Sequence, residues 1–121
     1  MSDFLKGDQF GQSSPFTKPN QLQTKAPSLD HLTIKKASLV FRAINHKLRQ
    51  DMIKLIDKKG QATVTEIFVD LRLEQSVASQ HLAILRRSGI VKTERDGKYM
   101  YYKLNLDRLE MINQMISDLL K

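Results

Sequence analysis

Apolar side chains recur at spacings of three and four residues in five parts of the chain, which is the pattern of amphipathic α-helices. A pair of lysines followed by Gly60 marks the end of the second of these stretches. Gly89 marks the end of the fourth in the same way. The pattern predicts helices over about residues 30–44, 46–59, 65–71, 75–88 and 106–121.

Two runs rich in β-forming residues, 90–94 and 98–104, interrupt the helical pattern. They flank Asp96-Gly97, a dipeptide that is a strong signal for a β-hairpin turn. Residues 62–64 are too few for an independent strand, so we expect them to pair with the edge of this hairpin. The result is a mainly α-helical chain with a small β-hairpin, an α+β fold in the order α-α-(short β)-α-α-β-β-α.

The helices over 65–71 and 75–88 are joined by a tight connection and have the proportions of a helix-turn-helix. The hairpin that follows carries Lys92, Arg95 and Lys98 near its tip. We expect residues 29–121 to form one domain. Residues 1–28 contain all three prolines and little apolar content, which predicts a flexible polar extension.

The charge of the chain favours a polyanionic partner. There are 20 Lys and Arg against 13 Asp and Glu, a formal net charge of +7. There is no Cys, which excludes disulfides, zinc-thiolate sites and a cysteine nucleophile. No apolar run reaches the length of a membrane span, and no signal-peptide pattern is present, so we expect a cytoplasmic protein without membrane contact.

Three strings of the sequence resemble the arsenic-repressor-like (ArsR) winged-helix regulators of bacteria. They are VFRAINHKLRQDMIKLI, LEQSVASQHLAILRRSGIV and RDGKYMYYKL, and the likeness covers about residues 32–121. The second string is similar to the family's recognition helix and the third to its wing. The resemblance implies a homodimer with one winged helix-turn-helix in each subunit.

The resemblance also implies which residues bind DNA. Small and amide side chains on the recognition helix can enter the major groove, and Gln80 is the best candidate to read a base, because Gln pairs bidentately with adenine. Cationic residues at the helix end and on the wing would contact phosphates. The predicted DNA-binding residues are Gln75, Ser76, Ser79, Gln80, His81, Arg86, Arg87, Arg95 and Lys98. Alternatively, Gln75 and Ser76 only cap or solvate the helix, and the charged tip only aids solubility.

The apolar stripes of the first and last helices are predicted to pair with a second copy of the chain, so that two recognition helices address neighbouring major grooves. The predicted dimer-interface residues are Ile34, Phe41, Leu109, Ile112, Ile116 and Leu119. The stripe of the last helix could instead serve the core of its own subunit.

Many proteins of the resembled family sense metals, but the residues expected for this are missing. The helix before the turn has no Cys, and the last helix has no His. His31, His46 and His81 lie in three different segments and form no ligand cluster by spacing. We therefore expect no metal and no cofactor, and the residues do not indicate an effector.

No catalytic motif is present either: there is no glycine-rich phosphate loop and no nucleophile elbow. The sequence thus predicts a sequence-specific duplex-DNA-binding regulator, a repressor and not an enzyme. One alternative is a winged helix used only for protein contacts. Another is single-strand or RNA binding through Tyr99, Tyr101 and Tyr102, although hairpin packing explains these rings more simply.

Overall fold

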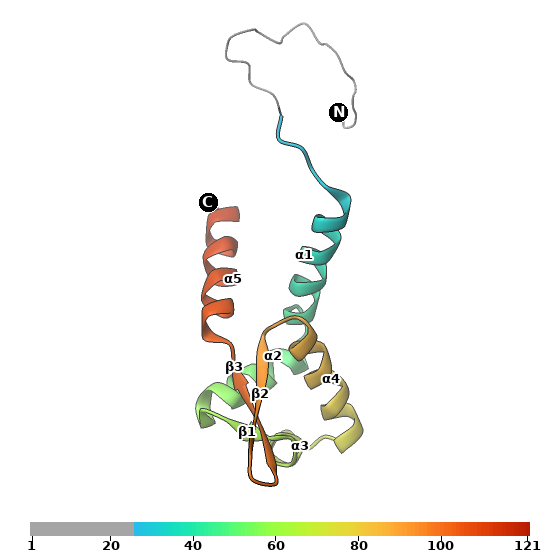
Figure 1. Cartoon of the computed structure of the whole chain (residues 1–121), viewed down its shortest axis with the longest axis vertical. Coiled ribbons are helices and arrows are strands. Elements are labelled where there is room, and N and C mark those ends of the chain that lie inside the picture. The colour runs from blue at the N-terminus through green and yellow to red at the C-terminus, as the bar shows by residue number, and fades with distance from the viewer. Residues whose placement is uncertain (1–25) are drawn as a thin grey trace, which may run out of the picture. The chain divides into compact units, whose positions relative to one another are not determined.

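Helices and strands follow each other in the predicted order along the part of the chain that the computed structural model describes, residues 26–121 (Figure 1). The elements are α1 (His31–Ile44), α2 (Lys47–Lys59), β1 (Ala62–Thr63), α3 (Val64–Asp70), α4 (Gln75–Arg87), β2 (Val91–Asp96), β3 (Tyr99–Leu104) and α5 (Leu106–Leu119). The extension predicted over 1–28 lies almost wholly outside the described residues. None of these helices is long and apolar enough to cross a membrane.

The start of α3 is set by a reciprocal pair of hydrogen bonds. The Thr63 hydroxyl accepts from the backbone N–H of Glu66, and the Glu66 carboxylate accepts from the backbone N–H of Thr63, at 3.2 and 2.9 Å. This capping box satisfies amide groups that a helix N-terminus otherwise leaves unpaired. Thr63, the last residue of β1, is therefore the N-cap of α3.

The strands form one antiparallel sheet in the order β1-β3-β2. Ala62 and Thr63 pair with Tyr102 and Tyr101 of β3, which confirms that this short segment joins the hairpin edge. The hairpin turn lies one residue later than Asp96-Gly97, because β2 extends to Asp96 and pairs with Tyr99. The turn residues are Gly97 and Lys98, and Gly97 takes a φ of +65°, which suits glycine at the first position of a tight hairpin.

The core forms where α2, α3 and α4 meet the sheet. Its largest fully buried side chains are Met52, Ile56, Ile67, Leu82, Leu85 and Ile90. They come from α2, α3, α4 and the segment leading into β2, so the helix-turn-helix and the base of the hairpin share one apolar core. Tyr102 of β3 packs against this core, as predicted for at least one ring of the hairpin.

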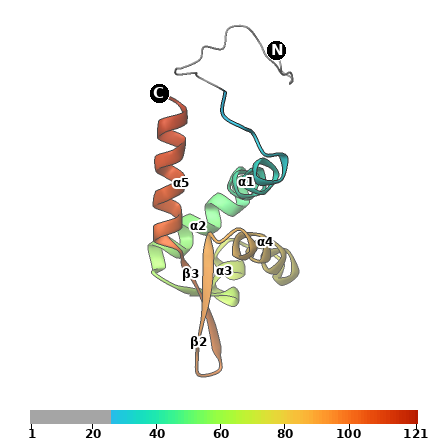
Figure 2. The same cartoon turned by 45° about the horizontal axis from the view of Figure 1, so that its top comes forward.

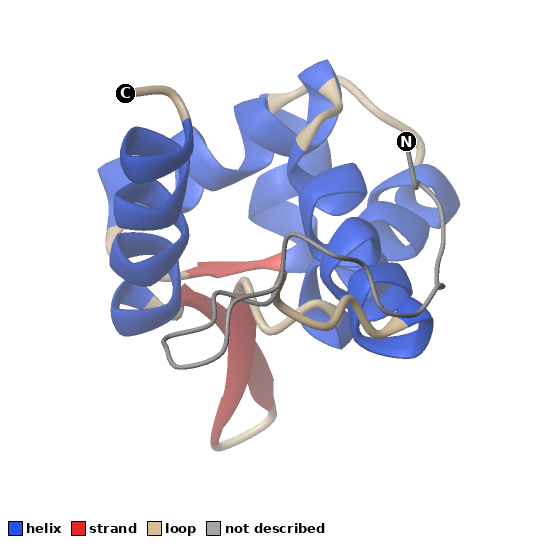
Figure 3. Cartoon of the chain, turned by 90° about the horizontal axis from the view of Figure 1, so that it is seen from above, coloured by secondary structure: helices blue, strands red, loops and turns tan. Residues whose placement is uncertain are grey.

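The hairpin projects from this core, away from the free ends of α1 and α5 (Figures 1 and 2). Viewed from above, α4 and α5 lie on opposite sides of the hairpin (Figure 3). The helix α4 is therefore placed beside the base of the hairpin, and α5 begins at this base on the other side, directly after β3. This arrangement is the predicted winged helix-turn-helix, in which α3 and α4 are the two helices and β2–β3 is the wing.

Candidate nucleic-acid interface

Both ends of α4 are held by the same kind of turn. After α3, the backbone N–H of Leu73 donates to the Phe68 carbonyl and that of Arg72 to the Val69 carbonyl, at 2.8 and 3.2 Å. Arg72 lies in the left-handed region, with a φ of +58°. These two bonds form a Schellman motif, which stops α3 and turns the chain sharply into α4.

The C-terminal end of α4 repeats the motif with a glycine. Gly89 has a φ of +76°, and its backbone N–H donates to the Arg86 carbonyl. The backbone N–H of Ile90 donates to the Leu85 carbonyl at 2.9 Å, and both side chains are buried. The direction of α4 relative to α3 and to the wing is thus fixed by backbone bonds at both ends and by the core.

One face of α4 is buried and the other is exposed along its whole length. Ala78, Leu82 and Leu85 face the core. The exposed residues include all the amide, hydroxyl and arginine residues predicted to bind DNA on this helix: Gln75, Ser76, Ser79, Gln80, Arg86 and Arg87. The structure brings these side chains to one surface, next to the wing.

His81 differs from the other predicted DNA-binding residues of α4 because its ring is half-buried against α2. The rings of His81 and His46 lie 4.8 Å apart, and His81 Nδ1 is 3.4 Å from a terminal nitrogen of Arg49. Burial lowers the pKa of His81, and the nearby His46 and Arg49 lower it further. The ring therefore lies where it packs α4 against α2.

We expect the lowered pKa of His81 to make the fold less stable in mild acid. As the pH falls below the ordinary histidine value of about 6.5, the unfolded chain takes up this proton more readily than the folded chain, so the free energy of unfolding falls. The loss is complete once the pH is below the lowered pKa of the folded state. The variant His81→Gln should lose stability less steeply than wild type in urea denaturation between pH 7 and about pH 5. His31→Gln, which alters an exposed histidine of α1, should keep the wild-type slope.

The tip of the wing carries cations that are free of carboxylate partners within the hairpin. Arg95 and Lys98 are exposed, and the Lys98 ammonium lies over the Tyr99 ring, 5.4 Å from its centroid. Lys103 is instead paired with Glu94 across the strands, and this hydrogen bond and charge lower the pKa of Glu94. Lys92, which was also predicted near the tip, lies instead at the base of the hairpin, where it faces Lys103, because the strands extend further than predicted. The tip therefore carries two available cations, Arg95 and Lys98.

The residues predicted for a dimer interface differ in how far they are buried in the single subunit. Ile112 is buried in the core of its own subunit, with Leu109 and Ile116 packed beside it. Ile34 and Leu119 are exposed, and Leu119 retains 77% of its accessible surface. Phe41 is half-buried and lines, with residues of α5, a groove of about 230 Å³ between α1 and α5.

Sequence reasoning did not single out three residues that the structure makes prominent. Met111 and Met115 lie on the exposed side of the α5 stripe, in line with Leu119 at intervals of four residues. The sequence pattern does not distinguish these exposed residues from the buried residues of the same stripe. Arg49 is buried, and its Nε donates to the Ala43 carbonyl at 2.7 Å, which ties the end of α1 to α2. Its position in an amphipathic helix did not reveal this role.

Within residues 26–121, no group of three His, Cys, Asp or Glu side chains is placed to hold a metal ion. The pair Glu66 and Asp70 is exposed on α3, where Glu66 caps the helix and Asp70 lies 3.4 Å from the Lys59 ammonium. Both carboxylates therefore have structural roles in this fold.

Comparison with known proteins places this surface in a family. Residues 46–93, which include the helix-turn-helix, match the family model described as bacterial regulatory protein, arsR family. The chain is 32% identical over 84 residues to the HTH-type transcriptional regulator MJ1325 of Methanocaldococcus jannaschii, covering 69% of this chain and 94% of that protein. It is also 32% identical over 82 residues to the transcriptional activator HlyU of Vibrio cholerae, covering 67% of this chain and 74% of that protein.

A solved structure agrees in fold. The crystal structure of the transcriptional repressor PagR of Bacillus anthracis has 26% sequence identity and a TM-score of 0.58, and the match covers 72% of this chain and 99% of that one. On the family match, the relatives and the winged helix-turn-helix described above, this chain belongs to the arsR family of bacterial regulatory proteins, which are transcriptional regulators.

Proposed function

We propose that this chain represses transcription by binding duplex DNA as a homodimer. In each subunit α4 enters the major groove, and the β2–β3 wing contacts the backbone or the minor groove. The observation that carries the proposal is the shared surface of α4 and the wing: exposed Gln, Ser and Arg side chains on one helix face, beside a hairpin whose tip carries Arg95 and Lys98.

The residues of this surface fall into two chemical types, one suited to reading bases and the other to contacting phosphates. Gln80 would pair with a base edge, and Gln75, Ser76 and Ser79 lie beside it on the exposed face of α4. Arg86, Arg87, Arg95 and Lys98 would supply phosphate contacts, which position the protein without reading sequence. His81 would act from its half-buried place by holding the helix against α2.

The phosphate role of the wing predicts a change in salt dependence. The double variant Arg95→Ala, Lys98→Ala should bind all duplexes more weakly, and the slope of log affinity against log salt should become shallower by about 0.9 for each phosphate that the wing no longer neutralises. Electrophoretic shifts at several salt concentrations measure both effects. The control Lys54→Ala, Lys58→Ala removes the same charge from exposed sites on α2 and should leave the slope near its wild-type value. An unchanged salt slope for the wing variant would show that the wing does not contact phosphates. If the wild-type protein did not bind duplex DNA even at low salt, a role in protein contacts would be favoured.

A dimer is supported by the apolar surface left open on α1 and α5. Met111, Met115 and Leu119 expose large apolar side chains along one face of α5, and Ile34 does so on α1. Contiguous exposed apolar surface of this kind is typical of interaction sites. A twofold pairing through these helices would set two copies of α4 at a fixed separation.

Repression is proposed because a dimer seated on two neighbouring major grooves occupies DNA that a polymerase would need. The similarity to PagR, which is described as a transcriptional repressor, supports this direction, whereas HlyU is described as an activator. A promoter-reporter assay with and without the protein decides between the two. We further propose that the protein acts in the cytoplasm. We also propose that its effector is not a metal ion, since the chain has no Cys and its last helix has no His.

A further inference from the structure

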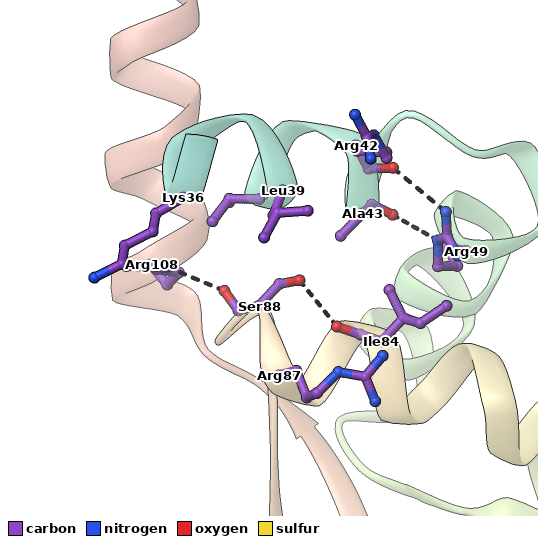
Figure 4. A pocket seen from close by; sticks show the side chains of 10 residues that line it. Lys36, Leu39, Arg42, Ala43, Arg49, Ile84, Arg87, Ser88 and Arg108 are labelled. Carbon is purple, nitrogen blue, oxygen red and sulfur yellow. Dashed lines mark hydrogen bonds between the residues drawn. The ribbon is translucent and has the colours of Figure 1, made fainter. Parts of the chain in front are cut away.

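A cavity of about 490 Å³ lies between α1, the last turn of α4 and the first turn of α5 (Figure 4). Five cationic side chains from four different helices line it: Lys36, Arg42, Arg49, Arg87 and Arg108. No carboxylate is among the lining residues, and none of these five cations is paired with a carboxylate within residues 32–121. Like charges gathered around one cavity repel each other, so the site favours an anion.

The hydrogen bonding of the two best-buried guanidinium groups is unequal. Arg49 donates to the carbonyls of Ala43 and Arg42, at 2.7 and 3.3 Å. Arg108 donates from one terminal nitrogen to the Ser88 carbonyl at 3.1 Å, but its Nε is buried and has no acceptor. A buried donor without an acceptor is unfavourable, and a guanidinium group binds a planar carboxylate well. The Arg108 Nε is inaccessible and lies against Gly89, so the guanidinium group that lines the cavity is incompletely satisfied by the protein itself.

Apart from Ser88, the rest of the lining is apolar. Leu39 and Val40 of α1 and Ile84 of α4 contribute aliphatic surface, and the methylene stems of the long cationic side chains add to it. A small hydrated anion such as phosphate would leave this surface without a partner. A ligand with both an anionic group and an apolar body matches both parts of the lining.

We propose that this cavity binds an organic acid that combines a carboxylate with an apolar body, such as a medium-chain fatty acid. The carboxylate lies with Arg108 and Lys36, and the apolar body lies against Leu39 and Ile84. A phosphate of DNA is a poorer candidate, because it would leave the aliphatic part of the lining without a partner, as inorganic phosphate would.

The position of the cavity gives the ligand a route to DNA binding, a consequence that rests on the proposed function. It contacts α1 and α5, which are proposed to set the spacing of the subunits, and the end of α4, which is proposed to read DNA. A ligand that binds better to one spacing of these helices shifts the protein toward that spacing and so changes its affinity for DNA. The coupling is reciprocal, because bound DNA changes the affinity for the ligand by the same factor.

Calorimetric titration of the full chain with octanoate tests the site itself, without DNA. We expect octanoate to bind, while octanol, which lacks the charge, and inorganic phosphate, which lacks the apolar body, bind at least about tenfold more weakly. The double variant Lys36→Gln, Arg42→Gln should weaken octanoate binding by about tenfold or more, because both side chains line the cavity and Arg42 is exposed enough to change without loss of the fold. The matched control Lys35→Gln, Lys54→Gln removes the same charge from outside the cavity and should bind like wild type.

Absence of octanoate binding, or equal weakening by the cavity variant and the control, would overturn the proposal. Equal binding of octanoate and phosphate would overturn the assignment of an apolar body. The regulatory consequence is tested separately, by measuring whether octanoate changes the affinity of wild type for duplex DNA but not that of the cavity variant. Failure of the chain to bind DNA would refute the proposed function. It would not affect the test of ligand binding to the cavity, because the calorimetric titration contains no DNA.

Discussion

Met115→Asp in α5 is expected to convert the protein from a dimer to a monomer and to weaken its binding to a two-half-site duplex on the order of a hundredfold. Met115 is 50% exposed in the single subunit and lines the groove between α1 and α5, beside Phe41. In the proposed dimer the partner covers this face, so the new carboxylate would lose its water without gaining a counter-charge. A monomer then holds only one recognition helix on the DNA.

Met115 is the better position for this test than Leu109, although both belong to the predicted apolar stripe. Leu109 packs against the core of its own subunit, so a charge there would also unfold the monomer. The control Ser117→Asp adds the same charge to an exposed site on α5, outside the apolar stripe, and should remain dimeric. Sedimentation velocity measures the assembly state, and urea denaturation checks that the monomer is folded. A Met115→Asp variant that sediments as the wild-type dimer would contradict the proposed use of this face.

Gln80→Ala is expected to relax sequence preference at one base position in each half-site while leaving binding to unrelated duplexes nearly unchanged. Gln80 is exposed in the second turn of α4, and an amide side chain can form two hydrogen bonds with adenine in the major groove. Loss of such a bidentate pair costs about 1 to 3 kcal/mol of discrimination, which corresponds to roughly 5- to 150-fold.

Competition shifts with a panel of single-base operator variants measure this effect. Gln114→Ala, a change of the same residue type on α5, should leave both affinity and preference unaltered. If Gln80→Ala weakened binding by the same factor on every sequence, Gln80 would be a general contact and not a base reader.

The fold could be predicted from the sequence where local signals act alone. The apolar spacing located the helices, and Gly60 and Gly89 marked two of their ends correctly. The hairpin turn was misplaced by one residue, because Gly97 takes the first turn position instead of the second. A dipeptide signal cannot distinguish these two registers, whereas the pairing of Asp96 with Tyr99 across the strands does.

The candidate site was harder to predict because it depends on contacts between distant segments. The α5 stripe is continuous in sequence, yet Ile112 belongs to the core while Met111 and Met115 lie open. Periodicity identifies an apolar face but not which neighbour covers it. Arg49 and Arg108 appear in sequence as ordinary helix cations, and only the arrangement of α1, α2, α4 and α5 in space brings them to one cavity.

The most direct test of a dimeric DNA reader is the selection of bound duplexes from a random library, followed by sequencing. Two copies of α4 held by paired α1 and α5 helices predict an enriched site with twofold symmetry, whose half-site centres lie about one helical turn, roughly 10 base pairs, apart. Enrichment of a single asymmetric half-site, or no enrichment over the starting library, would contradict the account.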